Sequence, residues 1–156
     1  MEVHYLQQVE YRHIVRIAGT DVDGSLKLVY GLKKIKGVGI RFAQAVVNIL
    51  GLDPNMRIGY LDEETVKKIE DVLSKPLDYG IPSWFLNRQK DIETGKDMHL
   101  LGSDLVLAMK LDIQRMKRIK CWKGVRHALG LKVRGQKTRT TGRTGRTVGV
   151  VRRKRK

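Results

Sequence analysis

The residues with the clearest capacity for chemistry lie in one stretch near the C-terminus, residues 134–147 (RGQKTRTTGRTGRT). Arginine offers a planar guanidinium that matches phosphate oxygens, threonine adds a hydroxyl donor, and glycine lets the main chain approach closely. The unit Thr-Gly-Arg occurs twice in succession, at 141–143 and 144–146. The stretch contains no aromatic side chain, which favours recognition of a phosphate backbone and of shape over reading of a single-stranded sequence.

The charge of the chain is concentrated around this stretch. The sequence has 156 residues and a net charge of +16, with 32 Lys or Arg against 16 Asp or Glu. Residues 1–109 carry 14 basic and 15 acidic residues, whereas residues 110–156 carry 18 basic residues and one acid, Asp112. A segment of like charge repels itself, and laying it along a polyanion neutralises it and releases counterions. We therefore predict that nucleic acid is its partner.

Two other uses of a basic segment are a solvated surface and attraction to a membrane. Solvated faces usually mix both signs of charge. Membrane attachment needs apolar anchors, and residues 134–147 contain no apolar side chain. The same lack prevents a core, so the stretch is expected to be extended or disordered until a partner orders it. No membrane partner is predicted, and the single Cys121 favours a reducing compartment, with the cytoplasm as the expected location.

A second candidate for phosphate binding is the hairpin at residues 37–39 (GVG), a hydrophobic residue between two glycines. The glycines permit a tight turn, and the N–H groups that open the following helix lie at its positive dipole end. Four basic side chains surround the turn: Lys33, Lys34, Lys36 and Arg41. A packing hairpin in which Val38 fills the core requires the same residue types, and the sequence leaves both interpretations open.

The patterns of common catalytic and cofactor sites are incomplete. Residues 130–138 (GLKVRGQKT) come near to a P-loop, but Gln136 is inserted before the lysine and no strand is expected upstream. A dinucleotide fingerprint would need glycine where Phe42 stands. The four histidines form no i, i+4 pair for a metal, and residues 102–104 (GSD) are not a nucleophile elbow. We therefore expect no cofactor, no metal and no enzymatic activity.

Three side chains just before the basic stretch carry further expectations. His127 lies among cations, which suits a hydrogen bond to RNA, and it equally suits the end of a helix before Gly130. Cys121 and Trp122 are expected to pack against the preceding helix, although Trp122 is also suited to stacking on a base.

A series of helices must position these residues. Apolar spacing predicts a first helix over about 26–36, after a turn-rich loop at 18–24, and a second helix that Gly51 ends. Asp62 is placed to cap a third helix, with Pro76 just beyond its end.

The pattern loosens over 78–101, which allows a short hairpin. Ser103 then begins a last helix with an apolar stripe formed by Leu105, Met109, Ile113, Met116 and Ile119. We expect this side to pack on the core, with cations on the other side. The folded part is predicted to be helical throughout, with a body over 1–129, its long helix near 104–120, and an extended basic tail over 130–156.

Several motifs together resemble the small-subunit ribosomal protein thirteen family. They are residues 16–20 (RIAGT), 35–39 (IKGVG), 121–127 (CWKGVRH) and 130–140 (GLKVRGQKTRT). The last of these is highly specific, whereas the glycine hairpin alone is weak. Residues 81–91 (IPSWFLNRQKD) and 140–143 (TTGR) are similar to the archaeal and eukaryotic cytosolic branch rather than the bacterial one.

The resemblance implies a mainly α, helix-two-turns-helix-type body with a long helix and an extended basic tail, located in the head of the small subunit. It implies binding to small-subunit ribosomal RNA and contact with small-subunit ribosomal protein nineteen. It also implies inter-subunit bridges, one of them to large-subunit ribosomal protein five, and a tail that runs towards peptidyl-site tRNA.

The resemblance and the distribution of cations together give a set of predicted RNA-binding residues. They are Lys36, Lys117, Arg118, Lys123, Arg126, His127, Arg134, Gln136, Lys137, Arg139, Arg143, Arg146, Arg152 and Arg153. The rival hypothesis is a DNA-binding or DNA-repair protein, because DNA glycosylases share helix-two-turns-helix elements. Such an enzyme needs a catalytic residue beside a pocket for the flipped base, and the sequence shows no candidate for one.

Overall fold

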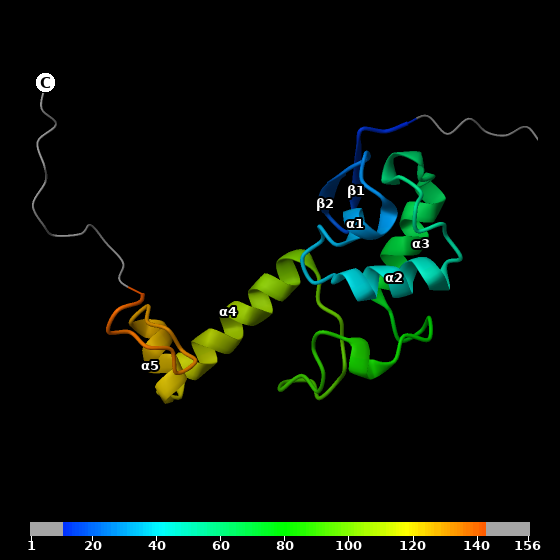
Figure 1. Cartoon of the computed structure of the whole chain (residues 1–156). Coiled ribbons are helices and arrows are strands. Elements are labelled where there is room, and N and C mark those ends of the chain that lie inside the picture. Colours follow the sequence, from blue (N-terminus) through cyan, green and yellow to red (C-terminus); the bar gives the residue numbers. More distant parts are fainter. Residues whose placement is uncertain (1–10, 143–156) are drawn as a thin grey trace, which may run out of the picture. The chain divides into compact units, whose positions relative to one another are not determined.

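The computed structural model describes residues 11–142 (Figure 1). In this part of the chain there are two strands, β1 (Ile14–Ile17) and β2 (Thr20–Asp23), and two short 3-10 helices, η1 (Ile58–Tyr60) and η2 (Ser83–Phe85). The α-helices are α1 (Leu28–Leu32), α2 (Ile40–Ile49), α3 (Glu63–Ser74), α4 (Gly102–Arg118) and α5 (Trp122–Ala128). Helices dominate, which confirms the predicted mainly α fold. The residues group into two compact units, the first ending at Leu107 and the second starting at Ala108. Within the described range, no helix combines the length and the apolar character that crossing a membrane requires.

β1 and β2 form an antiparallel hairpin where the sequence suggests a loop. The register pairs Ile17 with Thr20, and Ala18 and Gly19, with φ of 47° and 70°, make a two-residue turn of the kind that matches strand twist. The prediction of an exclusively helical body is therefore wrong at this point. Residues 20–23 (TDVD) have the composition of a turn. Polar side chains nevertheless flank Val22, which is buried, and this alternation of exposed and buried side chains is typical of a strand.

α1 is shorter than predicted because the chain tightens after Leu32. The expected apolar positions Leu28, Leu32 and Ile35 are all buried. Beyond α1 the Ile35 N–H donates to the Leu32 carbonyl at 3.1 Å, and the Val38 N–H donates to the Ile35 carbonyl at 3.1 Å. These i to i−3 hydrogen bonds form successive turns in place of a further helical turn.

The boundaries of α2 and α3 agree with the sequence prediction. Gly39 is the N-cap of α2, and Gly51, with a φ of 64°, follows its C-terminus. Asp62 takes the N-cap position of α3, but its side chain makes no capping hydrogen bond. Glu63 and Glu64 in the first turn still favour the positive end of the helix dipole.

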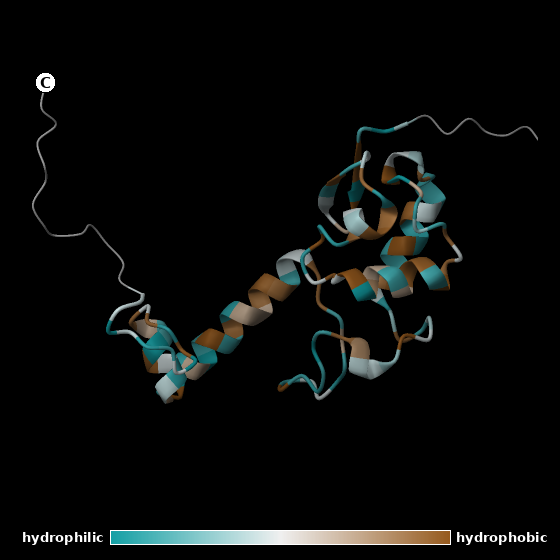
Figure 2. Ribbon diagram, in the orientation of Figure 1, coloured by the Kyte–Doolittle hydropathy of each residue, from teal (hydrophilic) through white to brown (hydrophobic). Residues whose placement is uncertain are grey.

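The first unit has a conventional hydrophobic core. Its buried apolar side chains come from β1, β2, α1, α2 and α3 and from the connecting segments, which add Ile35, Val38, Ile58, Leu61, Ile81 and Leu86. Figure 2 shows hydrophobic positions on these helices. Gly31 allows a close approach at the centre, because a Cβ there would lie 1.9 Å from Cδ1 of Ile58.

The segment between α3 and α4 contains the predicted short hairpin. The backbones of Arg88 and Met98 exchange two hydrogen bonds, of 3.2 and 2.8 Å. Asp91 accepts from Arg88 Nε at 2.8 Å and from the Thr94 N–H at 3.2 Å. These hydrogen bonds lower the pKa of Asp91 to about 2, with Arg88 the larger cause.

The long helix α4 begins one residue before the predicted Ser103, and its surroundings differ from the prediction. None of its residues is buried, and Met109 and Ile119, the latter one residue past its end, are 55% and 68% exposed. The prediction that its apolar side packs on the core is therefore wrong. Helical spacing predicts that a helix has an apolar face, but it does not predict what covers that face, which depends on other parts of the chain or on a partner.

Candidate nucleic-acid interface

The second unit is organised around a close contact between the last turn of α4 and α5. Lys120, with a φ of 55°, reverses the chain between the two helices. Cys121 is the N-cap of α5, where its Sγ accepts from the Gly124 N–H at 3.4 Å and donates to the Met116 carbonyl at 3.5 Å. The expectation that Cys121 packs against the preceding helix is confirmed.

Gly124 explains how the two helices come so close. It is the one buried residue of α5, and a Cβ at this position would lie 2.1 Å from the Met116 carbonyl oxygen. Only glycine fits such an approach, since the obstructing atom belongs to the backbone. The larger side chains of this helix pair therefore remain partly or fully at the surface, where they can meet a partner.

The predicted cations of α4 and α5 are accessible. Lys117, Arg118 and Lys123 are exposed, and none of them forms an ion pair with an acid of residues 11–142. The nearest acid along the chain, Asp112, lies 3.0 Å from Arg115. A group of exposed like charges without local counterions is the arrangement that a polyanion stabilises.

Arg126 and His127 occupy the last turn of α5 and are half-buried. Arg126 Nε donates to the Lys132 carbonyl at 2.9 Å, and its guanidinium carbon lies 5.7 Å from the centre of the Trp122 ring. His127 precedes the helix end as its helix-terminal interpretation requires, and its carbonyl accepts from the Gly130 N–H at 3.3 Å. A contact between His127 and RNA stays a prediction.

Trp122 does not pack against α4. Its side chain is 72% exposed, so the packing expectation is wrong and the base-stacking alternative stays open. Residues 121–122 thus divide their roles, because Cys121 turns inward to cap α5 and Trp122 faces solvent.

The described part of the predicted tail carries no helix or strand. Arg134, Gln136, Lys137 and Arg139 are all exposed. The segment also bends, since the Thr141 hydroxyl donates to the Lys137 carbonyl. A Cβ added at Gly142 would lie 3.4 Å from Lys132 Cε, so the end of this segment folds back against the residues at its start. The remaining predicted positions lie outside the described residues; they are Arg143, Arg146, Arg152 and Arg153.

Four cations of the described second unit are not in the predicted set: Lys110, Arg115, Lys120 and Lys132. Lys120 and Lys132 are exposed, one at the turn between the helices and the other after α5. Nothing in the charge pattern separates Lys120 and Lys132 from their neighbours, although Gly130, with a φ of 68°, marks the end of α5 just before Lys132. Both belong with the exposed cations of the second unit.

Lys36 belongs to a separate group of cations in the first unit. It is exposed beside the glycine hairpin, whereas Val38 is buried, so the core-filling role of Val38 is confirmed. Gly37 leaves no room for a side chain, because a Cβ there would lie 2.4 Å from the Leu100 carbonyl oxygen. Asn87 fixes this contact by donating to the Leu100 carbonyl at 2.7 Å and accepting from the Leu100 N–H at 2.9 Å. Binding of phosphate at the start of α2 stays a prediction.

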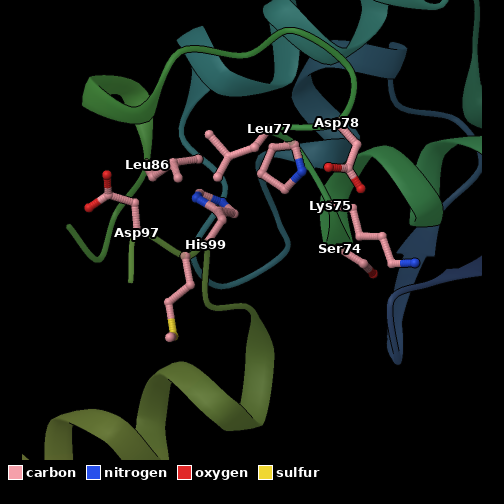
Figure 3. Close-up of a pocket in the computed structure, with 9 residues that line it drawn as sticks. Ser74, Lys75, Leu77, Asp78, Leu86, Asp97 and His99 are labelled. Carbon is pink, nitrogen blue, oxygen red and sulfur yellow. The ribbon is translucent and has the colours of Figure 1, made fainter. Parts of the chain in front are cut away.

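A pocket of about 220 Å³ lies in the first unit between the end of α3 and the segment that contains His99 (Figure 3). Its charged lining residues are Lys75, Asp78 and Asp97, so acids outnumber bases and the lining does not attract phosphate. His99 is 9% exposed, its ring stacks on Phe42 with centroids 3.9 Å apart, and its Nε2 has no hydrogen-bond partner. Burial lowers the pKa of His99.

The described residues hold no group of three or more His, Cys, Asp or Glu side chains able to bind a metal ion. The chemistry on offer is therefore charge, hydrogen bonding and one exposed aromatic ring in the second unit. A small helical body joined to a polycationic segment defines a class of protein that is typical of nucleic-acid binding.

The comparisons with known proteins identify the family within that class. Residues 16–144 match the family described as ribosomal protein S13/S18, and the chain belongs to it. Ribosomal proteins of this family are structural rather than catalytic, which supports the prediction that the chain is not an enzyme.

Individual relatives cover nearly the whole chain. The small ribosomal subunit protein uS13 of Staphylothermus marinus is 65% identical over 145 residues, covering 93% of this chain and 96% of its own. The uS13 proteins of Hyperthermus butylicus and Methanocaldococcus jannaschii are 57% and 52% identical, covering 93% and 96% of this chain and 96% and 99% of their own. The resemblance seen in the sequence, including its archaeal character, is confirmed.

Proposed function

We propose that the chain is a structural component of the small ribosomal subunit that binds small-subunit ribosomal RNA through its second unit and basic tail. The observation that carries the proposal is the group of exposed cations on α4, α5 and the segment after them, with no acid after Asp112. The predicted division into a body of residues 1–129 and a tail of 130–156 belongs to the same proposal. Membership of the S13/S18 family supports the ribosomal setting.

Electrostatic binding of this kind has a measurable signature. Each phosphate that the protein neutralises contributes roughly −0.7 to −0.9 to the slope of log affinity against log salt concentration. The experiment measures binding of the full chain to small-subunit ribosomal RNA at several salt concentrations. A chain truncated before Arg134 should lose much of the slope, and an unchanged slope would place the phosphate contacts elsewhere.

A double substitution tests the α4 cations without shortening the chain. Lys117→Gln with Arg118→Gln removes two exposed charges from the end of α4, and the slope should become shallower by about 1.4 to 1.8. The matched control is Lys67→Gln with Lys68→Gln on α3 of the first unit, where both side chains are also exposed. Equal losses from both pairs would contradict a localised interface.

We propose further that the tail lies near peptidyl-site tRNA, and that the chain contacts small-subunit ribosomal protein nineteen and, at an inter-subunit bridge, large-subunit ribosomal protein five. The motifs shared with the family support these partners, and the exposed apolar side chains of α4 favour contact with protein. Particles containing the chain truncated before Arg134 should retain peptidyl-site tRNA less well. Cross-linking from the exposed face of α4 identifies its protein neighbour.

A further inference from the structure

The two tryptophans of the chain are equally exposed but stand in different surroundings. Trp84 in η2 and Trp122 in α5 are 71% and 72% exposed. The Trp84 ring packs edge-on against Phe85 at 5.3 Å between centroids. The Trp122 ring has instead the guanidinium of Arg126 over it, at 5.7 Å from the ring centre.

The position of Arg126 is fixed independently of Trp122. Its Nε donates to the Lys132 carbonyl at 2.9 Å, which holds the guanidinium at the ring and leaves a cation–π pair at the surface. Arg126 also lies in the turn of α5 that follows Trp122. The indole is therefore braced by a neighbour on its own helix while most of its surface stays open to solvent.

The electrostatic setting of Trp122 selects the kind of molecule that would cover it. All the charged residues within four positions of it along the chain are basic, and no acid follows Asp112; they are Arg118, Lys120, Lys123 and Arg126. A nucleotide joins a flat π face to a negative phosphate, so one nucleotide engages both the ring and the cations. An apolar protein surface would cover the ring but leave these cations without partners.

We infer that the Trp122 indole, braced by Arg126, is a stacking platform for an unpaired base of RNA. The inference rests on the proposed RNA-binding function and deepens it, since it adds a contact to a base where the tail offers contacts to phosphates. Stacking of a base on an aromatic side chain is sequence-tolerant and does not depend on counterion release.

The experiment compares full-length variants in binding to small-subunit ribosomal RNA at several salt concentrations. Trp122→Ala should weaken binding about 5- to 150-fold, the range expected for losing one stacked base, with an unchanged salt slope. Trp122→Phe should recover most of the affinity because a ring remains. Trp84→Ala, the matched control in the first unit, should bind as the unaltered chain does. Circular dichroism should show that Trp122→Ala keeps its helices.

Fluorescence gives a second readout that a structural role would not produce. In the Trp84→Phe variant only Trp122 emits, and RNA should quench that emission; in the Trp122→Phe variant the emission of Trp84 should change little. Unchanged affinity of Trp122→Ala, or unquenched Trp122 at saturating RNA, overturns the inference. Normal RNA binding by Trp122→Ala with loss of assembly into subunits overturns it as well, in favour of a protein partner. Failure of the unaltered chain to bind RNA would instead overturn the proposed function.

Discussion

The two units of this protein are stabilised by different means. The buried apolar side chains all fall within residues 11–107, from Val15 to Leu86. In residues 108–142 the one buried residue is Gly124, and the α4–α5 pair relies on a close backbone contact and a thiol cap. The first unit has the means to keep its fold by itself, whereas the second exposes what a partner would bind.

Charge follows the same division. Residues 11–107 carry 14 basic and 13 acidic residues, whereas residues 108–142 carry 11 basic residues and one acid. Mixed charge suits a unit whose surface meets water, and one sign of charge suits a unit whose surface meets phosphate. Burial and charge therefore divide the chain at nearly the same place, and each of the following variants tests whether that division holds.

The largest expected effect on stability comes from the core of the first unit. Leu32 is 0% exposed, and Leu32→Ala should lower the free energy of unfolding by about 2–5 kcal/mol, because it removes buried apolar surface and leaves a cavity. Chemical denaturation followed by circular dichroism measures the change.

Leu129→Ala in the second unit is the matched control. Leu129 is 65% exposed, and its truncation should change the free energy of unfolding by no more than about 0.5 kcal/mol. A large loss from Leu129→Ala would mean that the second unit has a core of its own, and the contrast in burial would not hold.

The helices of the first unit were predictable because their signals are local. Apolar spacing, Gly51 and Asp62 each act within a few residues, and α2 and α3 begin and end close to where these signals predict, whereas α1 ends at Leu32, short of its prediction. The strand Thr20–Asp23 was missed because a four-residue strand with two aspartates has the composition of a turn. Its pairing with β1 supplies backbone hydrogen bonds that composition does not reveal.

The interface was predictable in composition but not in geometry. The charge split identifies the segment, yet nothing local shows that Gly124 brings α5 against α4 or that Trp122 points outward. The burial of α4 was predicted wrongly for the same reason, since a periodic stripe gives the direction of a face and not its neighbour. Contacts between residues distant in sequence, such as Asn87 with Leu100, are likewise invisible to spacing.

A change of pH is expected to have an intermediate effect on the free energy of unfolding, because His99 is buried. Its folded-state pKa lies below the ordinary value of 6.5 because burial disfavours the charged ring. Above pH 6.5 the His99 ring is neutral in both the folded and the unfolded chain, and the contribution of this neutral ring to the free energy of unfolding is fully present. As the pH falls below 6.5 the unfolded chain takes up a proton first, so stability is lost until the folded pKa is reached, at about 1.4 kcal/mol per unit of difference.

The measurement compares free energies of unfolding at pH 7.5 and pH 5. His99→Leu should reduce the pH dependence over this range, because it removes the buried group whose pKa is lowered. Asp91 does not interfere, since its pKa of about 2 lies far below the range. A pH dependence that survives His99→Leu would assign the effect to another group.

The smallest effect on the free energy of unfolding is expected from a substitution of Asp112, the last acidic residue before the cationic segment. Asp112 lies 3.0 Å from Arg115 with about a third of each side chain exposed, so Asp112→Asn should cost no more than about 0.5 kcal/mol of folding free energy. The same change removes the last acid before the cationic segment and releases Arg115 towards phosphate. RNA binding should become tighter, and its salt slope should steepen by up to about 0.9. Asp71→Asn, an exposed position on α3, adds the same charge to the first unit and should leave the slope unaltered. If both variants tightened binding equally, net charge alone would govern affinity, and the second unit would have no special place in it.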